Sequence, residues 1–255
     1  MKLQFNLKLA DNYKSNSQIA RVLSENWVYE NSYCPSCGNP KLISHHRNNP
    51  VADFFCPNCK SNYELKSFKS MPKFRIVDGA YNTMIDKVIN NENPHFFFLQ
   101  YSSSFSVLNY FSVPKYFFTY DLIEKRKPLS TKARRAKWVG CNILFGNLPQ
   151  TGIIYLVKDS TIIQPESVLY QWQRTSFLRN KKLESRGWLV ELISILEKMP
   201  SEIFTIQDVY KFEELLRQKY LENKFIKAKI RQQLQVLRDK KIIKFLGKGK
   251  YQKGA

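Results

Sequence analysis

The chain has 255 residues, of which 43% are hydrophobic and 14% aromatic, so it has ample material for packed cores and does not have the composition of a disordered protein. Forty-one Lys and Arg against 21 Asp and Glu leave a formal net charge of +20, which indicates a polyanionic partner. No stretch approaches the roughly 18 apolar residues that a membrane-spanning helix needs, and the first residues contain no apolar run of signal-peptide length. We therefore expect a cytoplasmic protein without a membrane partner.

The net charge is concentrated in two short segments. Residues 125–137, KRKPLSTKARRAK, hold seven basic and no acidic side chains, and residues 221–255 hold eleven basic and two acidic ones. A surface that is basic only for solubility usually mixes the two signs. The distribution therefore favours nucleic acid as the partner.

The first part of the chain predicts a central sheet flanked by helices. Apolar residues at helical spacing predict a helix over 15–33, and further helices are expected at 79–91 and 166–178. Helices and strands alternate irregularly, which is typical of a mixed α/β (α+β) domain, assigned here to residues 1–180. The runs that predict strands are VADFF (51–55), YELKSF (63–68), HFFFLQY (95–101), SFSVLNYFSV (104–113) and TGIIYLV (151–157).

The pattern changes near residue 187. Three amphipathic helices are expected, with a short extended piece before the second, followed by a basic hairpin around Gly247 and Gly249. Three helices and a hairpin predict a winged helix over 187–255, joined to the first domain by the polar linker 177–187. Trp172 and Trp188 lie on apolar helical faces and are expected in the cores.

Four cysteines have the spacing of a zinc site. Cys34 and Cys37 form one C-x2-C pair, and Cys56 and Cys59 form a second pair, with 18 residues between the two pairs. Four thiolates close a tetrahedral zinc shell without an open position, so the predicted Zn²⁺ is structural. Disulfides are the alternative, but a cytosolic context argues against them. Cys141 is left over and is expected to be an isolated core cysteine.

Asp53, Glu64 and Lys66 form a candidate catalytic group. Asp53 is expected at the end of a short strand, and Glu64 and Lys66 stand two apart on the next strand, so both project from the same face. This spacing is that of PD-(D/E)xK nucleases, in which the carboxylates of Asp53 and Glu64 would hold Mg²⁺. Lys66 would orient the water or stabilise developing charge on phosphate. By itself the pattern is also common on an ordinary solvated strand.

Longer stretches of the sequence resemble the DpnI type of restriction endonuclease along nearly the whole chain. The resemblance implies a methylation-dependent type II enzyme with a Mg²⁺-dependent PD-(D/E)xK domain and a winged helix, cutting double-stranded DNA at GATC that contains 6-methyladenine. It assigns metal-binding carboxylates to Asp53 and Glu64, the catalytic lysine to Lys66 and zinc to the four cysteines. The proline of the motif stands three residues before Asp53, at Pro50, and is not adjacent to it. The stretches that carry the resemblance include PVADFFC, YELKS, DGAYNTM, NPHFFFL, KPLSTKARRAKWVGCNI and IRQQLQVLRDKKIIKFLGKGKY.

The helix expected over 226–241 is the predicted recognition helix. Ile226, Ile230, Leu234 and Leu237 mark its buried stripe. Gln pairs well with adenine and Arg with guanine at major-groove edges, although a phosphate contact or simple solvation is the alternative for each residue. The side chains predicted to meet DNA are Lys227, Arg231, Gln232, Gln233, Gln235 and Arg238 on this helix, with Lys248 and Lys250 on the hairpin.

The basic segment TKARRAKWVG is a second candidate for contact with DNA. Arg134 and Arg135 precede Trp138 in a region with little helical or strand periodicity. One hypothesis is that Trp138 packs on an adenine methyl group, and the alternative is a tryptophan in the core.

Two other functions account for parts of the sequence. An HNH nuclease is suggested by His45 and His46 between the cysteine pairs, but such enzymes place a histidine soon after the second pair, where Lys60 stands. A zinc-ribbon and winged-helix regulator that does not cut DNA explains the charge and the cysteines but assigns no role to Asp53, Glu64 and Lys66. The preferred interpretation is a nuclease that acts on adenine-methylated DNA as a monomer.

Overall fold

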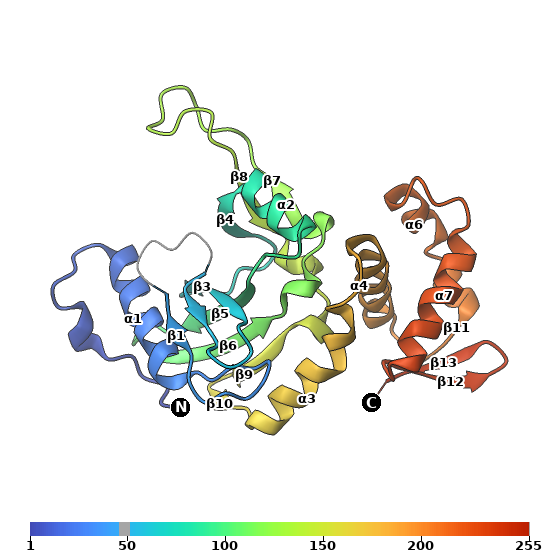
Figure 1. Cartoon of the computed structure of the whole chain (residues 1–255), viewed down its shortest axis with the longest axis horizontal. Coiled ribbons are helices and arrows are strands. Elements are labelled where there is room, and N and C mark those ends of the chain that lie inside the picture. Colours follow the sequence, from blue (N-terminus) through green and yellow to red (C-terminus); the bar gives the residue numbers. More distant parts are fainter. Residues whose placement is uncertain (46–51, 255) are drawn as a thin grey trace. The chain divides into compact units, whose positions relative to one another are not determined.

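The computed structural model describes residues 1–45 and 52–254 (Figure 1). The chain divides into two compact units, one formed by Met1–Leu148 and Gly152–Gln173 and the other by Pro149–Thr151 and Arg174–Ala255. Within the described residues, no helix combines the length and the apolar character needed to cross a membrane. The mixed α+β class, with a central sheet and a C-terminal helical unit, is confirmed.

The first unit is built on a seven-stranded sheet with the order β1-β2-β3-β5-β6-β9-β10. β3 and β5 are parallel, and the other neighbouring strands are antiparallel. Phe96, Phe97 and Phe98 of β5 are all fully buried, and because successive side chains point to opposite faces, both faces are covered at this strand. The strands are β1 (Ile43–Ser44), β2 (Phe54–Phe55), β3 (Asn62–Phe68), β5 (His95–Tyr101), β6 (Val107–Val113), β9 (Ile154–Lys158) and β10 (Thr161–Ile162).

Helices α1 (Asn16–Asn31) and α3 (Pro165–Thr175) cover one face of this sheet (Figure 1). Their tryptophans, Trp27 and Trp172, belong to the same buried cluster as Phe97 of β5, and Trp172 is a core residue as predicted. The chain also forms short 3-10 helices at Leu7–Ala10, Lys115–Phe117, Tyr120–Leu122, Phe145–Asn147, Gln150–Gly152 and Ser176–Leu178.

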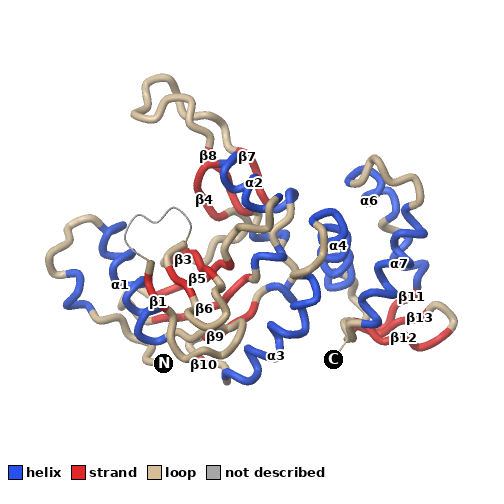
Figure 2. Tube along the Cα trace, in the orientation of Figure 1, coloured by secondary structure: helices blue, strands red, loops and turns tan. Residues whose placement is uncertain are grey.

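A second, three-stranded sheet with the order β4-β8-β7 belongs to the same unit, and α2 packs beside it (Figure 2). Residues 126–139 connect β7 to β8 and are called the basic loop below. Main-chain hydrogen bonds between Leu129 and Trp138 and from Arg126 to Gly140 continue the pairing of the two strands into this loop. The elements are β4 (Ile76–Ala80), α2 (Tyr81–Ile89), β7 (Ile123–Lys125) and β8 (Gly140–Ile143).

Among its described residues, the second unit contains four α-helices, besides short 3-10 helices, and a three-stranded sheet with the order β11-β13-β12. Trp188 is fully buried, as predicted, and stacks on Tyr220 with ring centroids 3.9 Å apart. Gly247 and Gly249 have φ of 94° and 70°, left-handed values that suit glycine in the hairpin turn. The elements are α4 (Leu183–Lys198), β11 (Ile203–Thr205), α5 (Ile206–Tyr210), α6 (Glu213–Lys219), α7 (Ile226–Asp239), β12 (Ile243–Gly247) and β13 (Lys250–Lys253).

Two predicted elements need correction near the site. Among the described residues of the strand expected over 51–55, only Phe54–Phe55 form β2, so Asp53 precedes this strand and does not end it. The helix expected at 79–91 starts at Tyr81, because Gly79 and Ala80 belong to β4 and pair toward β8. Pro50 and His46 lie outside the described residues.

Candidate active site and metal centre

The hairpin of β2 and β3 brings the predicted catalytic residues to one place. Phe54 pairs with Tyr63, and just before this pair the Asp53 amide donates to the Tyr63 carbonyl at 3.0 Å. Asp53 Oδ2 accepts a hydrogen bond of 2.7 Å from the Leu65 amide, between the two polar residues of β3. The Asp53 carboxylate is therefore fixed beside the strand that carries Glu64 and Lys66.

Glu64 and Lys66 meet on one face of β3, as their spacing predicts. Lys66 Nζ lies 2.6 Å from Glu64 Oε1 and also 2.6 Å from Asp78 Oδ1. Asp78 comes from β4 of the second sheet, and its side chain is only 6% exposed. A third carboxylate thus belongs to the site, and the spacing of residues along β3 does not predict it.

Burial sets the electrostatics of this group. It raises the pKa of Asp53 and of Glu64 above their ordinary values, while the Leu65 hydrogen bond on Asp53 and the Lys66 charge beside Glu64 oppose that effect. Burial alone would lower the pKa of Lys66, but Glu64 and Asp78 together raise it. Lys66 is therefore a fixed cation, suited to stabilising negative charge and not to accepting a proton.

The side chains of Asp53 and Glu64 provide the type of ligand atom that Mg²⁺ prefers. Both side chains offer hard carboxylate oxygens, and their raised pKa values show charges that burial penalises and that a bound cation would offset. Asp53 is also close enough for its charge to raise the pKa of Glu64. In the part of the chain that the structure describes, no group of three or more possible ligands forms around these carboxylates.

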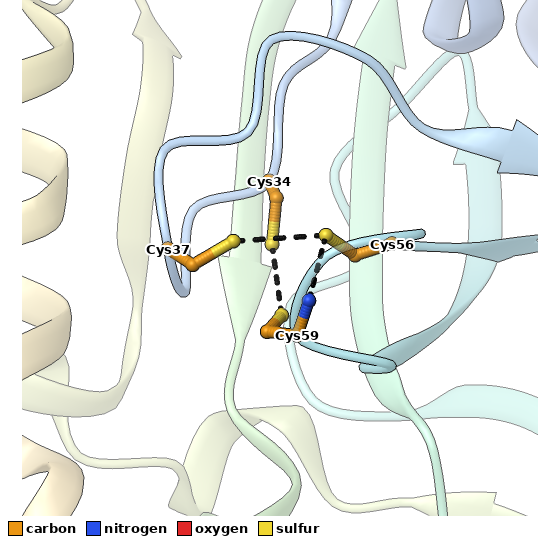
Figure 3. A group of neighbouring side chains, drawn as sticks. All are labelled: Cys34, Cys37, Cys56 and Cys59. Carbon is orange, nitrogen blue, oxygen red and sulfur yellow. Dashed lines mark hydrogen bonds between the residues drawn. The ribbon is translucent and has the colours of Figure 1, made fainter.

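The four cysteines form a compact cluster (Figure 3). Their sulfur atoms all lie within 4.8 Å of one another, and the pairs Cys34–Cys59 and Cys37–Cys56 are 3.6 Å apart. Zinc with Zn–S bonds of about 2.3 Å separates tetrahedral sulfurs by about 3.8 Å. The cluster therefore fits the predicted zinc ion.

The two cysteine knuckles have the same local geometry. Gly38 donates its amide to the Cys34 carbonyl at 2.8 Å, and Lys60 donates to the Cys56 carbonyl at 3.0 Å. Gly38 and Lys60 both have positive φ, of 76° and 59°, which turns the chain back after each pair. One knuckle follows α1 and the other joins β2 to β3, so an ion in the cluster would tie that helix to the hairpin with Asp53 and Glu64.

Local contacts adjust the acidity of the thiols. Burial raises the pKa of Cys34, and the hydroxyl of the buried Tyr63 lies 3.1 Å from its sulfur. Burial also acts to raise the pKa of Cys59, but contacts with Ser61 and with neighbouring thiols outweigh it and lower the pKa to about 7. Cys141 is fully buried outside the cluster, as predicted for an isolated core cysteine.

Trp138 does not lie in a core. Its side chain is half-buried at the base of the basic loop, where Arg134 and Arg135 are exposed. The Trp138 ring lies against the backbone of Gly140, where a Cβ would stand 2.7 Å from two ring carbons. The alternative of a core tryptophan is therefore wrong, and contact with DNA stays a prediction.

The predicted recognition helix has its apolar stripe buried, with Ile226, Ile230, Leu234 and Leu237 each 1% exposed or less. Gln233 is a correction, because it is 4% exposed and does not lie on an outer face. The burial follows from its position beside Leu234 on the packed side of α7. The other predicted DNA-facing side chains of this unit are exposed, namely Lys227, Arg231, Gln232, Gln235, Arg238, Lys248 and Lys250.

Some of the exposed side chains have intramolecular partners. Lys227 forms an ion pair of 3.2 Å with Glu213 of α6, and Arg231 donates to the Tyr210 hydroxyl at 3.0 Å. Both pairs join α7 to the preceding helical segment. A DNA phosphate would compete with these partners for the same two cations.

The described histidines do not complete an HNH site. His45 Nε2 lies 3.1 Å from Asn62 Oδ1, and its ring packs against Phe55. His95 is buried in β5, and its Nδ1 accepts a hydrogen bond of 2.8 Å from the Lys115 amide. Neither residue belongs to the cysteine cluster.

Comparison with protein families gives two matches that together cover most of the chain. The model of the Dam-replacing family, DpnI, matches residues 1–181, and the model of its Dam-replacing helix-turn-helix domain, DpnI_C, matches residues 184–253. The chain belongs to the DpnI family. This membership indicates a restriction nuclease with a DNA-binding domain, and the resemblance found in the sequence is confirmed.

The regions matched by the two DpnI family models, 1–181 and 184–253, adjoin near the start of α4. The Asp53, Glu64 and Lys66 group and the cysteine cluster both lie in the first matched region. The second contains α7 and the hairpin of β12 and β13.

Proposed function

We propose that the protein is a methylation-dependent type II restriction endonuclease that hydrolyses double-stranded DNA at GATC containing 6-methyladenine. The observation that carries the proposal is the meeting of Asp53, Glu64 and Lys66 on one hairpin, in a chain of the DpnI family. A regulator that only binds DNA would have no use for a buried cation between carboxylates. Residues 1–180 would form the nuclease domain and residues 187–255 the winged-helix domain.

The proposed chemistry assigns a role to each side chain. Asp53 and Glu64 would hold Mg²⁺, which when bound lowers the pKa of a coordinated water and offsets charge on the phosphate. The Leu65 amide donates a hydrogen bond of 2.7 Å to Asp53 Oδ2 and so fixes the orientation of the Asp53 carboxylate. Lys66, kept protonated by its neighbours, would stabilise the negative charge of the phosphate in the transition state.

Recognition of DNA is assigned to two basic surfaces. The exposed Arg134 and Arg135 of the basic loop are suited to phosphates, and the half-buried Trp138 offers an aromatic surface for the adenine methyl group. On α7, Gln232, Gln235 and Arg238 are exposed and suited to the adenine and guanine edges of GATC. Gln233 is left out of this set because it is buried.

Cleavage of plasmid DNA tests the proposal. The parent protein and Asp53→Ala are incubated with Mg²⁺ and with plasmids whose GATC sites are either methylated or unmethylated. We expect the parent to cut methylated DNA and Asp53→Ala to be slower by about a thousandfold, because a lost metal ligand removes several kcal/mol of transition-state stabilisation.

The matched control is Asp86→Ala, which removes an exposed carboxylate on α2 and should leave the rate unchanged. Binding of DNA by the parent without any cut would favour the regulator. Full activity of Asp53→Ala would show that another group catalyses the reaction.

A further inference from the structure

The Lys66 ammonium is held between carboxylates from two different sheets. Glu64 reaches it along β3 of the central sheet, and Asp78 reaches it from β4 of the second sheet, each at 2.6 Å. The Lys66 side chain is 21% exposed and that of Asp78 only 6% exposed, so solvent screens this pair weakly. The contact is therefore a defined part of the site and not a surface ion pair.

The backbone of β4 directs Asp78 toward the site. Ile76 is buried and Val77 is 61% exposed, so the alternation of the strand places Asp78 on the inward face with Ile76. The pairing of β4 with β8 then shifts register between Asp78 and Ala80. Such irregularities reorient side chains, and they are common next to active sites.

Glu64 cannot be the sole partner of the Lys66 ammonium if its carboxylate also binds a metal ion. In the proposed function, Glu64 is a ligand of Mg²⁺, and a bound ion would compete with Lys66 for the charge of the Glu64 carboxylate. A largely buried ammonium that loses its partner is strongly destabilised and moves toward solvent. Asp78 is the remaining carboxylate in contact with Lys66 Nζ among the described residues.

We propose that Asp78 is a positioning residue of the active site, whose carboxylate holds the Lys66 ammonium in place while Glu64 binds the metal. This inference rests on the proposed function. Asp78 acts through Lys66, and we assign it no contact of its own with the phosphate. The family resemblance gives roles to Asp53, Glu64 and Lys66 and gives none to Asp78.

The position of Asp78 also links the lysine to the basic loop. Asp78 is paired with Cys141 of β8, three residues after Trp138. Burial, with the nearby Asp78 charge, raises the pKa of the Cys141 thiol to about 12, so this neighbour stays neutral and does not compete for Lys66. The anchor of the lysine and the loop proposed to contact DNA therefore belong to one small sheet.

Lysine ammonium NMR tests the contact without any cleavage. In protein with ¹⁵N-labelled lysine, the Lys66 signal, assigned by its absence in Lys66→Ala, is recorded with and without Mg²⁺. We expect the parent signal to persist when Mg²⁺ is added and the Asp78→Asn signal to be lost, because only the parent retains a carboxylate that keeps the ammonium protected. Loss of the parent signal with Mg²⁺, or its persistence in Asp78→Asn, would overturn the proposal.

Steady-state cleavage of methylated DNA gives the second measurement. Asp78→Asn is nearly isosteric, and a displaced lysine should lower kcat about 100-fold while KM for DNA stays the same. Asp78→Glu restores the charge and should recover part of kcat, which a purely structural role would not explain. The matched control is Asp86→Asn, the same change at an exposed position on α2, with parent kcat expected.

The outcomes separate this inference from the proposed function. An active parent with an equally active Asp78→Asn would contradict the role of Asp78 alone, whereas an inactive parent would contradict both. If Asp78→Asn does not fold, as judged by its zinc content and circular dichroism, Asp78→Glu carries the test, with a lowered kcat at unchanged KM expected. A fall in Mn²⁺ affinity of Asp78→Asn as large as that of Asp53→Ala, measured by electron paramagnetic resonance, would make Asp78 a metal ligand and overturn its positioning role.

Discussion

Two residues after Trp138, a glycine leaves room for the tryptophan ring. A Cβ at Gly140 would stand 2.7 Å from two carbons of that ring, closer than atoms in contact can approach. Trp138 is thus held against the start of β8 while its side chain stays half-exposed. A fixed, partly exposed aromatic surface between basic residues is well suited to select one base modification, because little conformational entropy is lost on contact.

Replacing Trp138 should therefore reduce the preference for methylated DNA. Base–aromatic packing is worth about 1–3 kcal/mol, so Trp138→Ala should lower the ratio of Kd values for unmethylated and methylated GATC duplexes about tenfold. Gly140→Ala displaces the same ring and should change the ratio in the same direction. Binding of both duplexes is measured by fluorescence anisotropy.

The control for this prediction is Lys137→Ala, an exposed neighbour in the same loop. It should weaken binding of both duplexes equally, since a phosphate contact does not depend on methylation. An unchanged ratio in a folded Trp138→Ala protein would contradict a role in methyl recognition.

At the level of single residues, the sequence predicts contacts between side chains of the candidate site when both belong to one strand. Glu64 and Lys66 are two apart, and the alternation of β3 is enough to predict that they meet, as they do. Asp78 stands twelve residues beyond Lys66, and only the packing of a second sheet joins them. Its one signal was the stretch DGAYNTM, which contributes to the family resemblance without indicating a partner for Lys66.

At the level of elements, the hairpin of β2 and β3, which positions Asp53 beside Glu64 and Lys66, has little strand pairing. β2 has two residues, and only two residue pairs join it to β3. The knuckle with Cys56 and Cys59 closes its turn, and the cysteine cluster connects that turn to the segment after α1. Because short hairpins are marginally stable alone, an ion in the cluster would contribute much of the order around Asp53.

Removing zinc should therefore abolish cleavage even with Mg²⁺ in excess. After treatment with a zinc-selective chelator, we expect hydrogen exchange measured by mass spectrometry to show lost protection in residues 53–66. Protection in α7 and in the hairpin of β12 and β13 should remain, because this unit has its own buried core. Adding Zn²⁺, and not more Mg²⁺, should restore both protection and activity.

Cysteine variants provide the matched control for zinc removal. Cys59→Ala removes a member of the cluster and should behave like the chelated protein, whereas Cys141→Ala should retain its zinc. Unchanged protection of residues 53–66 in zinc-free protein would show that packing alone orders the hairpin.

The elements that could be predicted are those whose composition agrees with their structure. HFFFLQY contains the uninterrupted apolar run FFFL, and it forms the strand β5 at its predicted bounds, with every residue except Gln100 buried. β4 was missed because Asp78 and Gly79 have low strand propensity and its last two residues were assigned to the following helix. β7 and β8 are short strands on either side of the basic loop, so neither has enough residues to show a period.

At the scale of the whole molecule, the excess positive charge belongs to both units. The basic loop lies in the first unit, and the basic residues of α7 and its hairpin lie in the second. Each unit therefore carries its own basic segment, and neither segment includes Asp53, Glu64 or Lys66. Binding through many phosphates releases counterions, so the affinity for DNA should fall steeply as salt rises.

The dependence of DNA affinity on salt separates phosphate contacts from base recognition in the second unit. Lys250 is exposed on β13, and Lys250→Ala should reduce the slope of log affinity against log salt by about one for methylated and unmethylated duplexes alike. Lys253 lies on the same strand but donates to the Met199 carbonyl at 2.5 Å, so Lys253→Ala is the matched control and should leave the slope unchanged. Arg238→Ala, in contrast, should weaken GATC binding by about 1–3 kcal/mol more than binding of an altered site. Equal losses of affinity of Arg238→Ala for the GATC duplex and for the altered duplex would make Arg238 a phosphate contact and overturn its assignment to guanine.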